Sequence, residues 1–157
     1  MTNSVEKILY RKSALIFEEL GFLMPGSNTK ENARTDSTSA IVPFRGPFSG
    51  CLLVSLSSTL LPLLSANMLG EQACSNKEWE QDSLREISNV ICGNVLPAIY
   101  GFERIFQLDV PRLLDNPDPL LRGSEYRTEA HAHIFFDSGQ AAVTLLVESK
   151  AFASSIG

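Results

Sequence analysis

Residues 75–100 read SNKEWEQDSLREISNVICGNVLPAIY and form the longest helical pattern in the sequence. Apolar residues recur there at intervals of three and four, so they gather on one side of an α-helix. That side, which we expect to face the core, consists of Leu84, Ile87, Ile91, Val95 and Ala98. Ser75 and Glu78 have the spacing of a capping box, which predicts that the helix begins there and runs to about Tyr100.

Two pairs of strand-like runs stand on either side of this helix in the sequence. Ala40–Phe44 and Phe48–Ser57 are separated by a short Arg-Gly-Pro segment. Arg127–Phe136 and Gln140–Glu148 flank Asp137-Ser138-Gly139. Because short segments rich in turn-forming residues between such runs are typical of β-hairpins, the sequence predicts two hairpins.

Two shorter helices are expected before the central one. The first spans Val5–Leu20 with Gly21 as its stop, and the second begins at Ser57 or Ser58 and ends at Gly70. Together with the hairpins, these helices predict an α+β fold in which a mainly antiparallel sheet packs against a layer of helices.

The domain organisation follows from length and from turn-forming residues. A chain of 157 residues, of which 44% are hydrophobic, has the size of one domain spanning residues 1–157. Within it, residues 25–39 are polar and rich in turn formers, which predicts a mobile loop. Phe106–Val110 is a short apolar run that ends at Pro111, and Leu113–Arg122, which contains two prolines, is expected to be a loop.

Composition excludes several function classes. The net charge of −5 and the pI near 5.0 argue against nucleic-acid binding, which usually needs a basic surface. The N-terminus does not have the pattern of a secretory signal, and no apolar stretch approaches the roughly 20 residues that cross a membrane. We therefore expect a cytoplasmic protein. Cys51, Cys74 and Cys92 form no CxxC pair, and their odd number favours reduced thiols without a catalytic role.

The other side of the central helix carries a short polar ridge. Asp82, Glu86, Asn89 and Gly93 cluster there, so Glu86 and Asn89 project together from neighbouring turns. A solvent-facing helix side is polar as a rule, and Glu three residues before Asn is common by chance. Gly93 strengthens the signal, because glycine weakens a helix by about 1 kcal/mol relative to alanine. Its missing side chain lets another molecule's backbone approach, and the apolar Val90 beside it suits a docking surface.

This ridge and the segments before it resemble the CheC and CheX chemotaxis phosphatases. The resemblance is carried by Phe48-Ser-Gly50, Asn67-Met-Leu-Gly70 and Asp82xxxGlu86xxAsn89xxxGly93-Asn94, which occur in the order typical of that family. Pro111 is the candidate for a proline that follows the family's helix motif. The single copy of the motif resembles CheX rather than the two-motif CheC arrangement, and the resemblance implies a CheC/CheX-like fold.

The same resemblance implies a function and a set of roles. The protein would accelerate dephosphorylation of the aspartyl phosphate of a CheY-type response regulator. Asn89 would position the attacking water, because its amide both donates and accepts hydrogen bonds. Glu86 would pair with the lysine in the regulator's active site. Val90, Gly93 and Asp82 would contact the partner, although Asp82 is better explained as a solvated side chain.

The resemblance also bears on cofactors and assembly. No metal or other cofactor is expected in this chain, because the Mg²⁺ of phosphoryl transfer belongs to the regulator. The resemblance to family members with one motif implies a homodimer. An exposed edge strand of the last hairpin would offer a route to self-association. Neither nucleic acid nor a membrane is expected as a partner.

Two alternatives remain open. His131 and His133 lie two apart in an expected strand and share a face, a geometry that could bind a metal, although two imidazoles are too few for a site. The second alternative is a non-catalytic binding module for a response regulator or a motor-switch protein. The two functions differ at Asn89, since only catalysis requires its amide.

Overall fold

The sheet is built on the two predicted hairpins. β1 (Ser37–Arg45) pairs with β2 (Gly50–Ser57), and β5 (Tyr126–Phe136) pairs with β6 (Gly139–Glu148), both antiparallel. β2 and β6 join the hairpins, again antiparallel, and the resulting strand order is β3-β1-β2-β6-β5. The computed structural model describes residues 4–26, 36–70 and 76–149.

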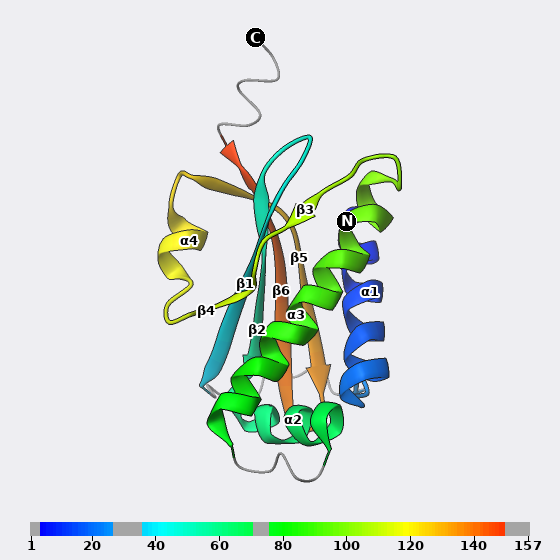
Figure 1. Ribbon diagram of the computed structural model, residues 1–157, viewed down its shortest axis with the longest axis vertical. Coiled ribbons are helices and arrows are strands. Elements are labelled where there is room, and N and C mark those ends of the chain that lie inside the picture. Colours follow the sequence, from blue (N-terminus) through cyan, green and yellow to red (C-terminus); the bar gives the residue numbers. More distant parts are fainter. Residues whose placement is uncertain (1–3, 27–35, 71–75, 150–157) are drawn as a thin grey trace.

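Three helices cover one face of this sheet. They are α1 (Ser4–Gly21), α2 (Leu61–Leu69), which follows the 3-10 turn η1 (Ser58–Leu60), and α3 (Lys77–Tyr100). Figure 1 shows α3 running diagonally across the sheet, with α1 beside it and α2 at one end of the molecule. Buried side chains from the three helices and from β1, β2, β5 and β6 form the main hydrophobic core. The predicted α+β class, a mainly antiparallel sheet against a helix layer, is confirmed.

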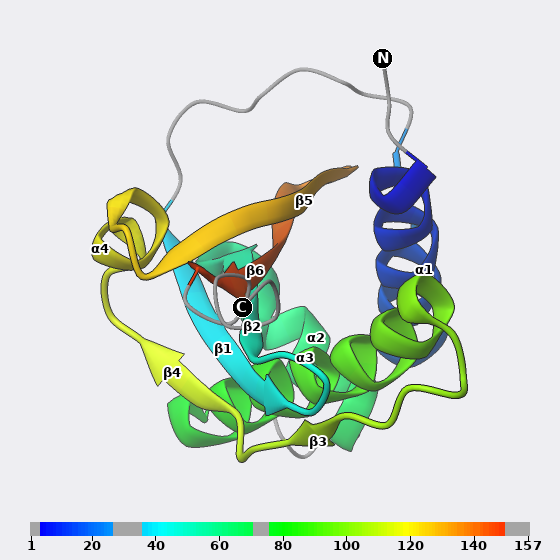
Figure 2. The ribbon, with the colours of Figure 1, turned by 90° about the horizontal axis from the view of Figure 1, so that it is seen from above.

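The segment expected to be a loop over 113–122 is ordered, so that prediction is wrong. β4 (Arg112–Leu114) pairs with β1, as does β3 (Gln107–Leu108), and α4 (Asp118–Arg122) follows. The prolines of this segment stand at the start of α4, where a missing N–H costs nothing and the fixed φ suits a helix. α4 lies on the sheet face away from α3 (Figure 2), where Leu120 packs against a small second core of Ile41, Cys51, Leu53 and Leu146.

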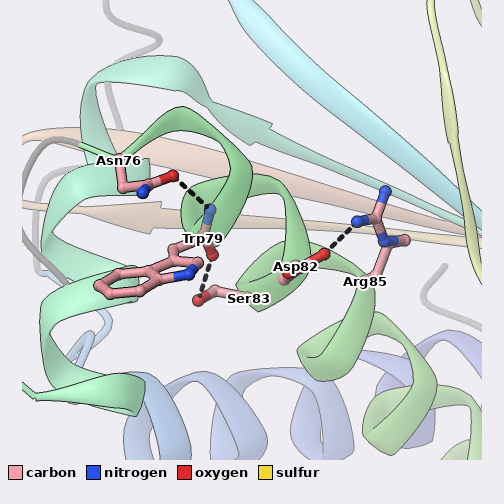
Figure 3. Close-up of polar contacts among 5 residues, drawn as sticks. All are labelled: Asn76, Trp79, Asp82, Ser83 and Arg85. Carbon is pink, nitrogen blue, oxygen red and sulfur yellow. Dashed lines mark hydrogen bonds and ion pairs between the residues drawn. The ribbon is translucent and has the colours of Figure 1, made fainter.

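Two predicted helix caps differ from the structure. The N-cap of α3 is Asn76, whose side-chain oxygen accepts a hydrogen bond from the Trp79 N–H at 3.2 Å (Figure 3). Ser75, the expected cap, lies outside the described residues. Ser57 stands at the N-cap position of η1, but its side chain makes no capping hydrogen bond. Its hydroxyl instead accepts from the Gln140 N–H at 3.0 Å and thereby ties β2 to the last hairpin.

Most of the loop predicted over 25–39 lies outside the described residues. Its last three residues, 37–39, belong to β1 instead, so the predicted boundary is wrong there. Ser39 is buried and its hydroxyl lies 2.7 Å from that of Ser55 on the neighbouring strand. This cross-strand hydrogen bond lets a polar residue continue the strand. No helix in the described ranges is long and apolar enough to cross a membrane.

Candidate functional site

α3 buries one side and exposes the other, as its sequence period predicts. Its fully buried residues include Leu84, Ile87, Ile91 and Val95. Ala98, which was expected among them, is only half-buried near the end of the helix. On the opposite side Asp82, Glu86 and Gly93 are exposed, and Asn89 is half-buried. We call these four residues the polar ridge. It lies opposite the buried side of α3.

Asp82 is engaged within its own helix. Its carboxylate forms a short ion pair with the Arg85 guanidinium, three residues further along (Figure 3). The Asp82 side chain is 51% exposed and that of Arg85 is 33% exposed. A surface pair of this kind is worth about 0–1 kcal/mol, so its main effect is to neutralise part of the charge at this end of the polar ridge.

Glu86 and Asn89 are uncommitted. Neither side chain makes a hydrogen bond or an ion pair with another residue in the described ranges. Asn94, by contrast, donates from its amide nitrogen to the Val90 carbonyl oxygen at 2.8 Å. Of these two asparagines of α3, therefore, Asn89 has its amide available to a water or a partner, because Asn94 already bonds its own helix.

Gly93 and Val90 differ in how well they suit a docking surface. A β carbon added to Gly93 would meet only Leu108 Cδ1, at 3.8 Å, which is ordinary van der Waals contact. No described neighbour therefore requires glycine at this position. Val90 is half-buried and packs against the main core, so only part of its side chain is open to a partner.

A groove beside the polar ridge was not predicted from the sequence. It has a volume of about 570 Å³ and is lined by Glu19, Leu20, Phe22, Asn67, Met68, Leu69, Asp82, Ser83 and Glu86. The C-terminal end of α1, α2 and the first turns of α3 meet at this end of the molecule (Figure 1). The Asn67 amide donates to the Gly21 carbonyl oxygen at 2.7 Å and ties α2 to the end of α1. An available signal was the apolar Phe22 directly after the predicted helix stop.

The other candidate groups have neighbours of their own. His131 Nδ1 lies 2.8 Å from the Thr144 hydroxyl, and His133 Nε2 lies 2.9 Å from Oε1 of Gln140. The described part of the chain holds no cluster of three or more His, Cys, Asp or Glu residues that could bind a metal ion. Burial raises the pKa of both the Cys51 and the Cys92 thiols to about 12, so both stay protonated at neutral pH. Cys74 lies outside the described residues.

Several solved structures share the fold. CheX from Desulfovibrio desulfuricans is 16% identical with a TM-score of 0.70, and the match covers 93% of this chain and 100% of that one. CheX from Vibrio vulnificus is 15% identical with a TM-score of 0.69, covering 93% and 97%. CheX in the CheX–CheY–BeF₃–Mg²⁺ complex from Borrelia burgdorferi is 14% identical with a TM-score of 0.69, covering 91% and 97%. No curated protein matches the sequence.

The family assignment comes from the sequence itself. A family model described as "Chemotaxis phosphatase CheX" matches residues 38–136. This span runs from β1 to the end of β5 and includes the whole of α3. Since this match covers more than half of the sequence, the chain belongs to the CheX family of chemotaxis phosphatases.

Proposed function

We propose that the protein is a phosphatase that accelerates hydrolysis of the aspartyl phosphate of a CheY-type response regulator, with Glu86 and Asn89 as its catalytic residues. The observation that carries the proposal is the exposed Glu86 beside the uncommitted amide of Asn89 on the outer side of α3. Membership of the CheX family supports the activity, and the complex of Borrelia burgdorferi CheX with CheY supports the choice of partner.

Asn89 would act by positioning. An acyl phosphate already has a good leaving group, so attack by water on phosphorus breaks the P–O bond and releases the aspartate carboxylate and inorganic phosphate. The barrier falls if the water is held in line with that bond. The Asn89 amide can accept one hydrogen bond from the water and donate another, and it needs no proton transfer of its own. α3 is anchored by fully buried side chains on its inner side, which gives the amide a fixed platform.

Glu86 would orient the complex. A carboxylate one turn from Asn89 pairs with the active-site lysine of the regulator and sets the register in which Asn89 reaches the phosphoryl group. Such a pair is weak in water and stronger once docking excludes solvent. The Mg²⁺ of the reaction is expected on the regulator rather than on this chain.

The remaining residues of the polar ridge would make docking contacts. The exposed Gly93, whose missing side chain leaves only Leu108 Cδ1 nearby, supports close approach by the regulator's backbone, and the exposed part of Val90 would add apolar contact. Asp82, which is paired with Arg85, would contribute mainly to the local charge.

The test is the loss of phosphate from a ³²P-labelled CheY-type regulator with and without the protein. We expect the wild type to accelerate phosphate release. In Asn89→Ala this acceleration should fall on the order of 100-fold with binding retained, since removal of one positioned group commonly costs that much. Glu86→Ala should impair both binding and turnover. An absence of acceleration across several regulators of the CheY type would refute the activity.

A second candidate is a binding module without turnover, for a response regulator or a motor-switch protein. It is favoured by the exposed Gly93 and by the groove next to Asp82 and Glu86, because both suit docking and neither requires chemistry. In that case Asn89→Ala would keep its affinity and the wild type would leave the phosphate lifetime unchanged.

We also propose that the protein forms a homodimer. β5 ends the strand order, and in the described ranges the one β-pairing on its outer edge is an isolated bridge from Pro25 to Phe136. A second copy could extend the sheet along the rest of that edge. Light scattering on the purified protein measures this directly, and a monomer mass at micromolar concentration would contradict it.

A further inference from the structure

Phe22 adopts a backbone conformation that aromatic residues rarely take. Its φ is +53°, and in the described ranges it is the one residue other than glycine with a positive φ. The Phe22 N–H donates to the Glu18 carbonyl oxygen at 3.1 Å, so Phe22 closes α1 with a left-handed residue. Glycine or asparagine usually fills that position, because a bulky side chain is strained there.

The residues on either side of Phe22 are packed closely, whereas Phe22 itself is not. The glycine of this segment, Gly21, is required one residue earlier, where a β carbon would lie 2.7 Å from Leu64 Cδ1. Leu23, one residue later, is buried at 3% exposure. The Phe22 side chain between them is 67% exposed, so its ring has little part in the core. Fold stability alone would favour a small residue at position 22.

Phe22 stands on the wall of the groove beside the polar ridge. Leu69, at the end of α2, also lines the groove and is 53% exposed, so the groove presents an open apolar surface. Three carboxylates, those of Glu19, Asp82 and Glu86, also line it, Asp82 being the one that is paired with Arg85. Among the described lining residues there is no lysine or arginine. Since Asp82 and Glu86 belong to both the groove and the polar ridge, the two form one continuous surface.

We propose that this groove is a second docking site for the response regulator, with Phe22 as its anchor. This second site rests on the proposed function. The part of the regulator that enters it would be an apolar side chain flanked by lysine or arginine, next to the regulator's phosphorylation site. The apolar wall would bury the side chain, and the carboxylates would attract the basic flanks. Exposed aromatic residues in such places often dominate binding energy. The strain at Phe22 is then retained for recognition.

Phe22→Gly separates recognition from stability. Glycine relieves the left-handed strain, so we expect the melting temperature to rise by about 2–4 °C. The same variant should bind a CheY-type regulator loaded with BeF₃ and Mg²⁺ about tenfold more weakly, and the effect on phosphate release should fall on KM rather than kcat. Phe102→Ala is the matched control, because Phe102 is 87% exposed and follows the other end of α3. It should bind like the wild type.

Glu19→Gln tests the charge of the groove. Glu19 lies outside the polar ridge, so its replacement should raise KM and reduce the salt dependence of binding without changing kcat. Wild-type affinity in Phe22→Gly, together with normal phosphatase activity of the wild type, would overturn the groove while leaving the proposed function intact. A lower melting temperature in Phe22→Gly would overturn the strain argument. Weaker binding by Phe22→Gly, with a wild type that accelerates nothing, would support the groove and refute the phosphatase.

Discussion

A β carbon on Gly21 would lie 2.7 Å from Cδ1 of Leu64, so α1 and α2 meet where only a hydrogen atom fits. Leu64 is fully buried in the main core. The Asn67 amide, 2.7 Å from the Gly21 carbonyl oxygen, ties the same two helix ends together. These contacts join two helix ends that line the groove, and the left-handed residue that closes α1, Phe22, follows directly.

Gly21→Ala should therefore destabilise the fold. Forcing a methyl group into this contact is expected to lower the free energy of unfolding by about 1–3 kcal/mol, the usual cost of overpacking. Urea denaturation measures the change. If Gly21→Ala were as stable as the wild type, the helices would have room to separate and the close contact would not constrain the groove.

Gly93→Ala should have the opposite effect on stability. The added methyl group meets only Leu108 Cδ1, at 3.8 Å, and alanine is the better helix former by about 1 kcal/mol. The free energy of unfolding should rise by that amount, while binding of the regulator weakens because the methyl group stands on the docking face. Calorimetry gives the first quantity and a binding titration the second. Unchanged affinity in this variant would remove Gly93 from the proposed docking surface.

Asn89→Asp probes the amide with almost no change in shape. A carboxylate accepts hydrogen bonds but cannot donate one, and it would place a negative charge near the phosphoryl group. We expect acceleration of phosphate release to be lost at least as completely as in Asn89→Ala. Asn94→Asp is the matched control on the same helix, since the Asn94 amide bonds the Val90 carbonyl. Retained activity in Asn89→Asp would contradict positioning by the amide.

Arg85→Gln should free the carboxylate of Asp82. The loss of an exposed pair changes stability by less than about 1 kcal/mol. The polar ridge becomes more negative, so a regulator with a basic active-site edge should bind more tightly at low salt, and the gain should vanish at high salt. Binding titrations at two ionic strengths measure this. A gain that survives high salt would point to a change in shape rather than charge.

The thiols of Cys51 and Cys92 should be inert in the native protein. Burial raises the pKa of each to about 12, and reagents such as iodoacetamide attack the thiolate. In a Cys74→Ser variant, labelling at pH 8 should be slow until denaturant unfolds the chain. Fast labelling of the folded variant would mean that the cores around these two residues open readily.

Sequence by itself determined the elements whose signals are local. The last hairpin follows from the Asp137-Ser138-Gly139 turn and the two strand-like runs that flank it. The exposure of Glu86 follows from the hydrophobic periodicity of α3. Both signals depend on residues within a few positions of one another. Local signals also misled. Leu113–Arg122 was expected to be loop because of its prolines, yet β4 pairs with β1 and α4 begins at those prolines.

The tertiary structure alone decided what depends on distant neighbours. Ser57 was expected as a helix cap, but it bonds Gln140 on a hairpin formed much later in the chain. The groove exists because Gly21 and Leu64 bring α1 and α2 together beside α3. Phe22, one residue after Gly21, is exposed and has a positive φ, which nothing in its local sequence indicates. Hydrophobic periodicity and turn-forming residues predict local backbone structure. Packing between segments far apart in the sequence determines which polar groups find hydrogen-bond partners and which side chains remain exposed to a partner.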